Sequence, residues 1–223
     1  MHPQRLEKFK AVVARRQPDL AVVLENVHDP HNLGAVLRSC DAVGILNVFI
    51  LFTEDHLRKD RVRLGKKTSA GARKWLNVHF YTEVDACVAH LRRDYDLLVG
   101  TRLSDDAQSI YDLDLTQRIA LVFGNESAGI SAELQAHMDG NFLIPQAGMV
   151  QSLNVSVACA VCVYEAYRQR LSVGRYDTAP SLDPEGRAAL LADYVERHEN
   201  RTRQHTIGNA ASNDDGPTSR KEK

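Results

Sequence analysis

The chain has 223 residues, of which 43% are hydrophobic and 26% are charged, and its formal net charge is −1. This length and composition are typical of one α/β core with short extensions rather than of two full domains. No apolar run approaches the roughly 20 residues that cross a bilayer, and the N-terminus lacks the apolar stretch of a signal peptide, so we expect a cytoplasmic protein without a membrane segment.

In chain order, the first predicted elements are a helix, a strand and a second helix. Residues 1–17 carry apolar side chains at helical spacing, which predicts an amphipathic helix that Pro18 interrupts. The short apolar run at 20–27 predicts a buried strand, and the Asp-Pro pair that follows predicts a turn. Residues 31–44 then continue as a helix with one apolar stripe, and a glycine ends it.

The remainder of the chain alternates between strand patterns and helical patterns. Further strands are predicted at 48–52, 77–82, 97–103, 119–125 and 141–145. Further helices are predicted at 84–95, 131–138, 151–171 and 184–201. Such alternation is typical of a parallel, layered α/β sheet. The last residues, 202–223, are polar, and we expect them to be disordered.

Basic residues gather in two stretches although the whole chain is nearly neutral. The stretch at 57–74, predicted as loops around a short helix, contains Arg58, Lys59, Arg61, Arg63, Lys66, Lys67, Arg73 and Lys74. The N-terminal stretch contains Arg5, Lys8, Lys10, Arg15 and Arg16. Two local basic clusters favour a polyanion bound on one face, and the alternative is an ordinary solvated helix surface.

Several common site motifs are absent or incomplete. The segment LGKKTS resembles the end of a phosphate-binding loop, but Asp60 occupies the required earlier glycine position. No GxGxxG follows the first strand, and no GxSxG is present. His28 and His31 lack a third ligand, so we expect no metal site. Cys159 and Cys162 lie in an apolar helical run without a second cysteine pair, so we expect buried thiols.

Three segments place polar residues at the ends of apolar strands, namely 25–38, 121–131 and 144–158. In open α/β sheets, ligands bind at the carboxyl ends of the strands, and helix N-termini attract anions. For each segment alone, turn and capping chemistry is the alternative, because Asn, Ser and Gly are ordinary turn residues. The three segments together, in this order, favour one shared site.

These segments resemble the motifs of the SpoU family of SPOUT RNA ribose methyltransferases. The first motif, NxxAxxR, is matched by Asn32, Ala35 and Arg38. The second, a strand ending in GNE, is matched by Gly124, Asn125 and Glu126. The third, IPxxGxxxSLNVSVA, is matched from Ile144 to Ala158 and includes Ser152, Leu153 and Asn154. The segments ARRQPDL, VHDPHN and YEAYRQR are further similar to the TrmH branch, which methylates the D-loop guanosine 18 of tRNA.

The resemblance extends over residues 3–176 and implies a fold. It implies a SPOUT α/β knot, in which helices flank a parallel sheet and the segments 121–131 and 144–156 form a deep C-terminal trefoil knot, a rare exception to unthreaded chains. We therefore divide the chain into an N-terminal helical basic arm at 1–19, a SPOUT methyltransferase domain at 20–172, a C-terminal helical extension at 173–201 and the polar tail. The C-terminal part departs from the long helical extension of some relatives.

The resemblance also implies a cofactor and a set of site residues. S-adenosylmethionine would bind at Thr101, Gly124, Asn125, Ile144, Ser152 and Leu153. Arg38 would be the central catalytic residue, contacting the substrate phosphate and the ribose 2′-OH. The residues that orient this arginine and the ribose would be Asn32, Glu126, Ser152 and Asn154. Because the pKa of arginine lies above about 12, we expect Arg38 to clamp phosphate and stabilise charge rather than remove the proton, with Glu126 as its carboxylate partner.

The implied partners are tRNA and a second copy of the chain, with no metal and no membrane. RNA phosphates would contact Arg5, Lys8, Arg15, Arg16, Arg61, Lys66 and Lys67. Two alternatives stay open. The same chemistry could act on another RNA, such as the tRNA wobble nucleotide or ribosomal RNA, or the chain could be a non-catalytic RNA-binding protein. The presence of Arg38, Glu126 and Asn154 favours the enzyme.

Overall fold

The computed structural model describes residues 1–54, 57, 71–104, 107–200 and 206–208. Most of the basic stretch at 57–74 lies outside the described residues, including Arg61, Lys66 and Lys67.

A parallel β-sheet forms the centre of the molecule, as the alternation of strands and helices predicts. Its strands are β1 (Gln17–Glu25), β2 (Ile45–Leu51), β3 (Asn77–Tyr81), β4 (Leu97–Thr101), β5 (Gln108–Ser109), β6 (Ile119–Phe123), β7 (Gly140–Leu143) and β8 (Thr206–Gly208). Among the described residues, their order across the sheet is β5-β7-β4-β6-β1-β2-β3-β8, and all the strand pairs are parallel. The carboxyl ends of β4, β6, β1 and β7 therefore meet at one edge.

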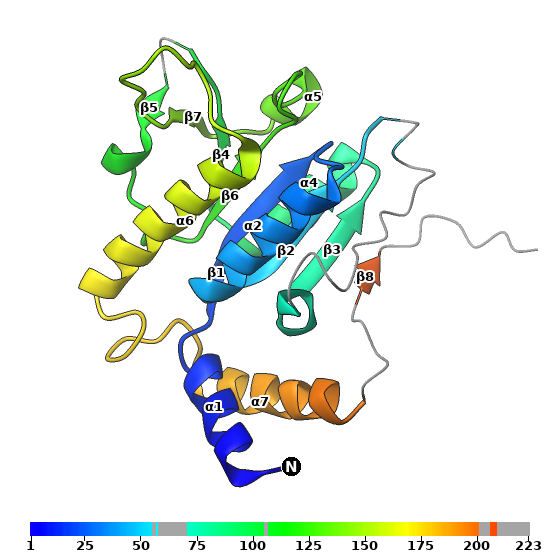
Figure 1. Cartoon of the computed structure of the whole chain (residues 1–223), viewed down its shortest axis with the longest axis vertical. Helices are drawn as coiled ribbons and strands as arrows, with labels where there is room; N and C mark the ends of the chain where they lie inside the picture. The colour runs from blue at the N-terminus through cyan, green and yellow to red at the C-terminus, as the bar shows by residue number, and fades with distance from the viewer. Residues whose placement is uncertain (55–56, 58–70, 105–106, 201–205, 209–223) are drawn as a thin grey trace, which may run out of the picture.

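Helices cover the sheet, and the two terminal helices lie together beyond one end of it (Figure 1). The α-helices are α1 (Pro3–Val13), α2 (Pro30–Ala42), α4 (Val84–Asp94), α5 (Ala132–Gln135), α6 (Val155–Ser172) and α7 (Pro184–Glu199). Two short 3-10 helices are η1 (Ala72–Trp75) and η2 (Ile110–Asp112). Helices α2 and α6 lie side by side on one face of the sheet, and α1 packs against α7 below it (Figure 1).

The two faces of β1 build two separate cores. Leu20, Val22 and Leu24 pack against α2 and α6, while Ala21 and Val23 pack in the cluster that contains α4. This division follows from the strand, in which successive side chains point to opposite faces. Because β1 is covered on both faces, its central residues, 20–24, are an uninterrupted apolar run instead of an alternating one.

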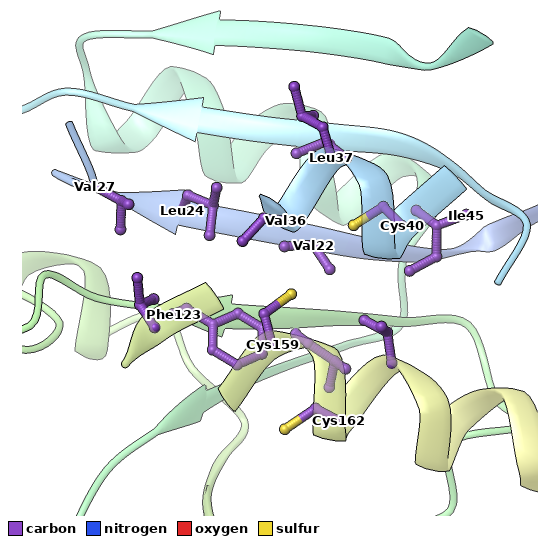
Figure 2. Close-up of a cluster of buried hydrophobic side chains, with 14 of the residues drawn as sticks. Val22, Leu24, Val27, Val36, Leu37, Cys40, Ile45, Phe123, Cys159 and Cys162 are labelled. Atoms are coloured by element: carbon purple, nitrogen blue, oxygen red, sulfur yellow. The ribbon is translucent and has the colours of Figure 1, made fainter. Parts of the chain in front are cut away.

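The four cysteines are buried free thiols, as the apolar surroundings of the CxxC predict. Figure 2 shows Cys40 of α2 with Cys159 and Cys162 of α6 among the apolar side chains between these helices and the sheet. Burial raises the pKa of Cys162 to about 12. Such a thiol stays protonated at neutral pH and acts as a small apolar residue.

Arg16 corrects one prediction, because it is buried inside the protein and is not part of a basic surface. Its guanidinium donates to the Asp41 carboxylate at 2.5 Å, to the Tyr194 hydroxyl at 2.8 Å and to the Ile45 carbonyl at 3.0 Å. The side chain is fully enclosed and joins α2, β2 and α7. A guanidinium with these partners cannot bind an RNA phosphate without breaking the terminal helices away from the sheet.

Several element boundaries also differ from prediction. The first strand begins at Gln17, so Pro18 lies inside it, next to an irregularity in the pairing with β2 where the missing N–H is tolerated. Helix α6 begins only at Val155, because Asn154 caps it and leaves 151–153 as loop. Helix α5 covers four of the eight residues predicted. Within the polar tail, Thr206–Gly208 pairs with β3, whose outer edge offers unpaired backbone groups.

The buried role of Arg16 gives a stability prediction. Replacing Arg16 by Met should lower the free energy of unfolding by about 2–4 kcal/mol, because several buried acceptors lose their donors at once. The matched control is Arg15→Met at the neighbouring exposed position, which should change stability by less than about 0.5 kcal/mol. Urea unfolding followed by circular dichroism measures both, and equal stabilities for the two variants would contradict the assigned role.

Candidate active site

A cavity of about 560 Å³ lies where the carboxyl ends of β4, β6 and β7 meet the start of α6. It is walled by three loops, which follow β4, β6 and β7, and the last of these leads into α6. The residues predicted to bind a cofactor all line it, namely Thr101, Gly124, Asn125, Ile144, Ser152 and Leu153. Apolar side chains such as Phe142 and Val155 form the deeper wall, and amide and carboxylate groups surround the opening.

The loop at 124–130 is folded tightly against itself. The backbones of Asn125 and Gly129 exchange hydrogen bonds at 3.1 and 2.8 Å, and the Asn125 side-chain oxygen accepts from the N–H of Ser127 at 2.8 Å. A Cβ on Gly124 would lie 2.1 Å from the carbonyl carbon of Gly129, and Gly129 itself has a φ of +69°. The sequence needs glycine at both positions for this close return of the chain.

Three polar side chains from different segments form a hydrogen-bonded chain beside the cavity. Asn154 Nδ2 donates to Asn32 Oδ1 at 3.1 Å, and Asn32 Nδ2 donates to Glu126 Oε1 at 2.6 Å. Asn154 Oδ1 accepts from the N–H of Ser156 at 2.9 Å, which caps α6 and turns the amide nitrogen toward Asn32. Each donor therefore points in one direction along the chain, toward the Glu126 carboxyl group, which accepts.

Arg38 stands apart from this chain. It is exposed on α2 and, among the residues that the structure describes, has no hydrogen-bond or ion-pair partner. Its expected pairing with Glu126 is therefore wrong for this single chain, because the Glu126 carboxylate accepts from Asn32. Asn32 and Arg38 are six residues apart on one helix, which separates them by about 9 Å along the axis. Arg38 instead lines a second cavity of about 540 Å³, together with Trp75 and Tyr164.

Of the other predicted site residues, Ser152 is exposed at the wall of the first cavity. Arg5, Lys8 and Arg15 are exposed on or next to α1. The pKa of His198 on α7 is lowered first by desolvation and then by the positive charges of Arg5 and Lys74, so these groups lie near one another. Exposed positive charge is therefore present on and next to α1, whereas α7 also carries the carboxylates of Glu185, Asp193, Glu196 and Glu199.

A protein-family model described as the SpoU rRNA Methylase family matches residues 19–164 of the chain. The chain belongs to the SpoU family. The matched range begins at the first central strand and ends inside α6, so it contains both halves of the polar chain of side chains.

Two relatives are similar over most of both chains, and a third over about two thirds. A Thermus thermophilus tRNA (guanosine(18)-2′-O)-methyltransferase is 42% identical over 193 residues, which cover 86% of this chain and 96% of the relative. The crystal structure of an A. aeolicus TrmH/SpoU tRNA modifying enzyme matches with a TM-score of 0.79 and 33% identity, covering 90% and 98% of the two chains. The SpoU methyltransferase AviRb from Streptomyces viridochromogenes, solved with the cofactor AdoMet, matches with a TM-score of 0.60 and 29% identity over 71% of this chain and 64% of that one.

The described residues of this SpoU protein contain neither a candidate membrane span nor a candidate metal site. No helix there is both long enough and apolar enough to cross a membrane. No group of three or more His, Cys, Asp and Glu side chains is placed there to hold a metal ion.

The sequence patterns missed three residues that hold the cavity of this SpoU protein in shape. Glu25 ends β1, Asn26 follows it, and Ser131 caps the start of α5. All three form hydrogen bonds that fix the loop at 124–130. A signal for Glu25 exists in the sequence, because a carboxylate that directly follows an apolar buried strand needs a polar partner. The identity of that partner could not be found, since Ser131 is 106 residues further along the chain.

The tight loop gives a prediction for Gly124. Alanine at this position should lower the free energy of unfolding by about 1–3 kcal/mol, because the added Cβ meets backbone atoms that cannot rotate away. Gly148→Ala is the control, since a Cβ there has no atom within 4 Å. Thermal and urea unfolding provide the comparison, and a Gly124→Ala protein as stable as the control would disprove the close approach.

Proposed function

We propose that this protein is a tRNA (guanosine(18)-2′-O)-methyltransferase, which transfers a methyl group from S-adenosylmethionine to the ribose 2′-OH of the D-loop guanosine. The observation that supports this most is the hydrogen-bonded chain of Asn154, Asn32 and Glu126 beside a cavity, in a SpoU protein whose T. thermophilus relative carries that name. We place the enzyme in the cytoplasm together with its substrate.

The cavity suits a nucleoside cofactor. Its size lies within the roughly 300–1,000 Å³ of small-molecule pockets, and it combines an apolar interior with polar groups at the opening. Backbone groups at Gly124, Ile144 and Leu153 would hold the adenine and methionine parts. When bound, S-adenosylmethionine supplies an electrophilic methyl group on a sulfonium.

The work of the polar chain is to hold the ribose in line for attack. Alignment of two reacting groups is worth about 7–11 kcal/mol. Asn32 and Asn154 are fixed in orientation by their mutual bond, so they can present amide groups to a sugar without first reorganising. Ser152 would contact the sugar from the opposite wall. The deep trefoil knot at 121–131 and 144–156, which the resemblance implies, stays a prediction.

Arg38 would bind the phosphate of the target nucleotide and stabilise the charge that develops on the ribose oxygen. Its exposed guanidinium, with no partner in the described part of the protein, suits this role because no internal ion pair must be broken first. The separation of Arg38 from the first cavity means that substrate or a second protomer would have to bridge the two.

We further propose a homodimer formed by the outer face of α6. Val157, Tyr164 and Leu171 are 48%, 52% and 45% exposed and recur every seven residues, which places them on one stripe two helical turns apart. An exposed apolar stripe on a soluble helix marks an interaction surface. Tyr164 also lines the cavity of Arg38, so a partner on this stripe would lie beside the catalytic arginine.

The proposed tRNA surface combines the N-terminal segment with the basic stretch at 57–74. Arg5, Lys8 and Arg15 are exposed and would contact backbone phosphates, as would Arg61, Lys66 and Lys67, which lie outside the described residues. Binding through phosphates weakens as salt concentration rises. Shape and an unstacked loop nucleotide would select the target.

The decisive test of function is methyl transfer from radiolabelled S-adenosylmethionine to unmodified tRNA, followed by mapping of the modified ribose. We expect one product at guanosine 18, and no transfer to tRNA already methylated there. Because the family description also names rRNA, ribosomal RNA fragments and wobble-position substrates are the competing arms. Transfer to these and not to guanosine 18, or to no RNA at all, would reject the proposal.

Arg38→Ala should lower kcat by about 100-fold or more with unchanged cofactor affinity. The control is Arg118→Ala, at another exposed arginine, which should leave kcat unchanged.

The dimer has its own test. Tyr164→Glu would place a charge in an apolar interface and should convert the dimer into a monomer. Light scattering after gel filtration would then give a mass of 24.9 kDa instead of about twice that value. Tyr111→Glu is the matched control, because Tyr111 is equally exposed, at 52%, and lies on η2, outside the stripe of Val157, Tyr164 and Leu171. An unchanged mass for Tyr164→Glu would remove this face from the interface.

A further inference from the structure

Glu25 is a buried carboxylate that the chemistry above does not use. It ends β1 and is completely inaccessible to solvent. Burying a charge is costly unless hydrogen bonds satisfy it, so its partners show what the residue does. Oε2 accepts from the backbone N–H of Ser131 at 2.7 Å, and Oε1 accepts from the Ser131 hydroxyl at 2.6 Å. Both oxygens are therefore used by one residue.

Asn26, the next residue, makes a second contact with the same loop. Its φ is +54°, a left-handed conformation, and its side chain exchanges hydrogen bonds with Thr53 at 2.8 and 2.9 Å. In this conformation the Asn26 carbonyl accepts from Asn125 Nδ2 at 3.1 Å. Asn26, which follows β1, thus holds Asn125, where the loop begins, and Glu25, the last residue of β1, holds Ser131, where the loop ends.

Everything between these two anchor points lines the proposed cofactor cavity. Residues 125–130 are all part of its wall, and Glu126 among them is the carboxylate that accepts from Asn32. Ser131 also connects the loop to α5, because its hydroxyl accepts from the N–H of Leu134 at 3.2 Å and caps this helix. A displacement of Ser131 would therefore move the cavity wall and the polar chain together.

We propose that Glu25 is a positioning residue for the cofactor cavity, which acts through Ser131 to hold the loop at 125–130 in its binding conformation. The identity of the ligand rests on the proposed function, whereas the control of the loop by Glu25 does not. Glu25 does not touch the cavity itself, so its effect is indirect.

The rival explanation is that Glu25 only stabilises the fold, and Glu165 provides the control for it. Glu165 is also a buried carboxylate with both oxygens hydrogen-bonded, to Arg168 and Gln169, but it lies on α6 and does not line the cavity. Glu165→Gln should reduce stability in the same way as Glu25→Gln, without changing the loop. The comparison separates positioning from general stability.

The first measurement is hydrogen exchange of the ligand-free full chain. In Glu25→Gln, the amides of 125–131 should exchange faster than in the wild type, while those of β2 should not; in Glu165→Gln, the loop should exchange as in the wild type. Ser131→Ala keeps the backbone N–H bond and should show a smaller effect. Loop amides that exchange at the wild-type rate in Glu25→Gln would overturn the proposal.

The second measurement is calorimetric binding of S-adenosylmethionine. Glu25→Gln should raise Kd by about tenfold or more, and Glu165→Gln by less than about twofold. Combining Glu25→Gln with Ser131→Ala should add less than the sum of the two effects, because both remove the same contact. Equal Kd changes in Glu25→Gln and Glu165→Gln would reduce Glu25 to a structural residue. If the wild type does not bind this cofactor, the proposed function fails while the exchange experiment still decides the role of Glu25.

Discussion

The buried end of β1 is the constraint on which the site depends. β1 is paired on both edges, with β2 and β6, and packed on both faces. Its backbone is therefore held rigidly at the centre of the sheet. The loop at 124–130 has little regular structure of its own beyond one short bridge. The loop is held in position because it is hydrogen-bonded to Glu25, the last residue of β1, and to Asn26, which follows it. Rigid strands that position irregular loops are the usual basis for binding sites in α/β proteins.

The second half of the site depends on the packing of α2 against α6. Asn32 directly precedes Leu33, and Asn154 directly precedes Val155, and both of these apolar residues are buried in the same cluster. Each amide is thereby held one residue from a close-packed position. The hydrogen bond between them forms only if the two helices keep their spacing, which Cys40 and Cys159 help to fill. The apolar core between these helices and the polar chain at their ends are therefore one structural unit.

The sequence predicted the elements and contacts that leave a local pattern. Apolar runs located the central strands, and the motif residues Asn32, Glu126 and Asn154 meet because parallel strands bring their ends to one edge. Contacts that depend on a tertiary partner were not predictable. Arg16 belongs to a run of basic residues, and nothing in that run distinguishes a buried guanidinium from a solvated one. The predicted pairing of Arg38 with Glu126 was wrong for this chain. The Glu126 carboxylate accepts from Asn32 instead, at the start of the helix that carries Arg38.

The contrast between Arg38 and the buried arginines Arg16 and Arg170 explains why Arg38 is suited to a substrate. Arg170 is fully buried and donates to Asp19, to Gln17 and to the carbonyls of Leu115 and Gln117, which fixes the end of α6 to the base of the sheet. Arg16 is satisfied in the same way. An arginine with such partners has no donors left for phosphate, because the guanidinium has a limited set of N–H groups. Arg38 is exposed and has no hydrogen-bond or ion-pair partner among the described residues, so its N–H groups are available to a charged ligand.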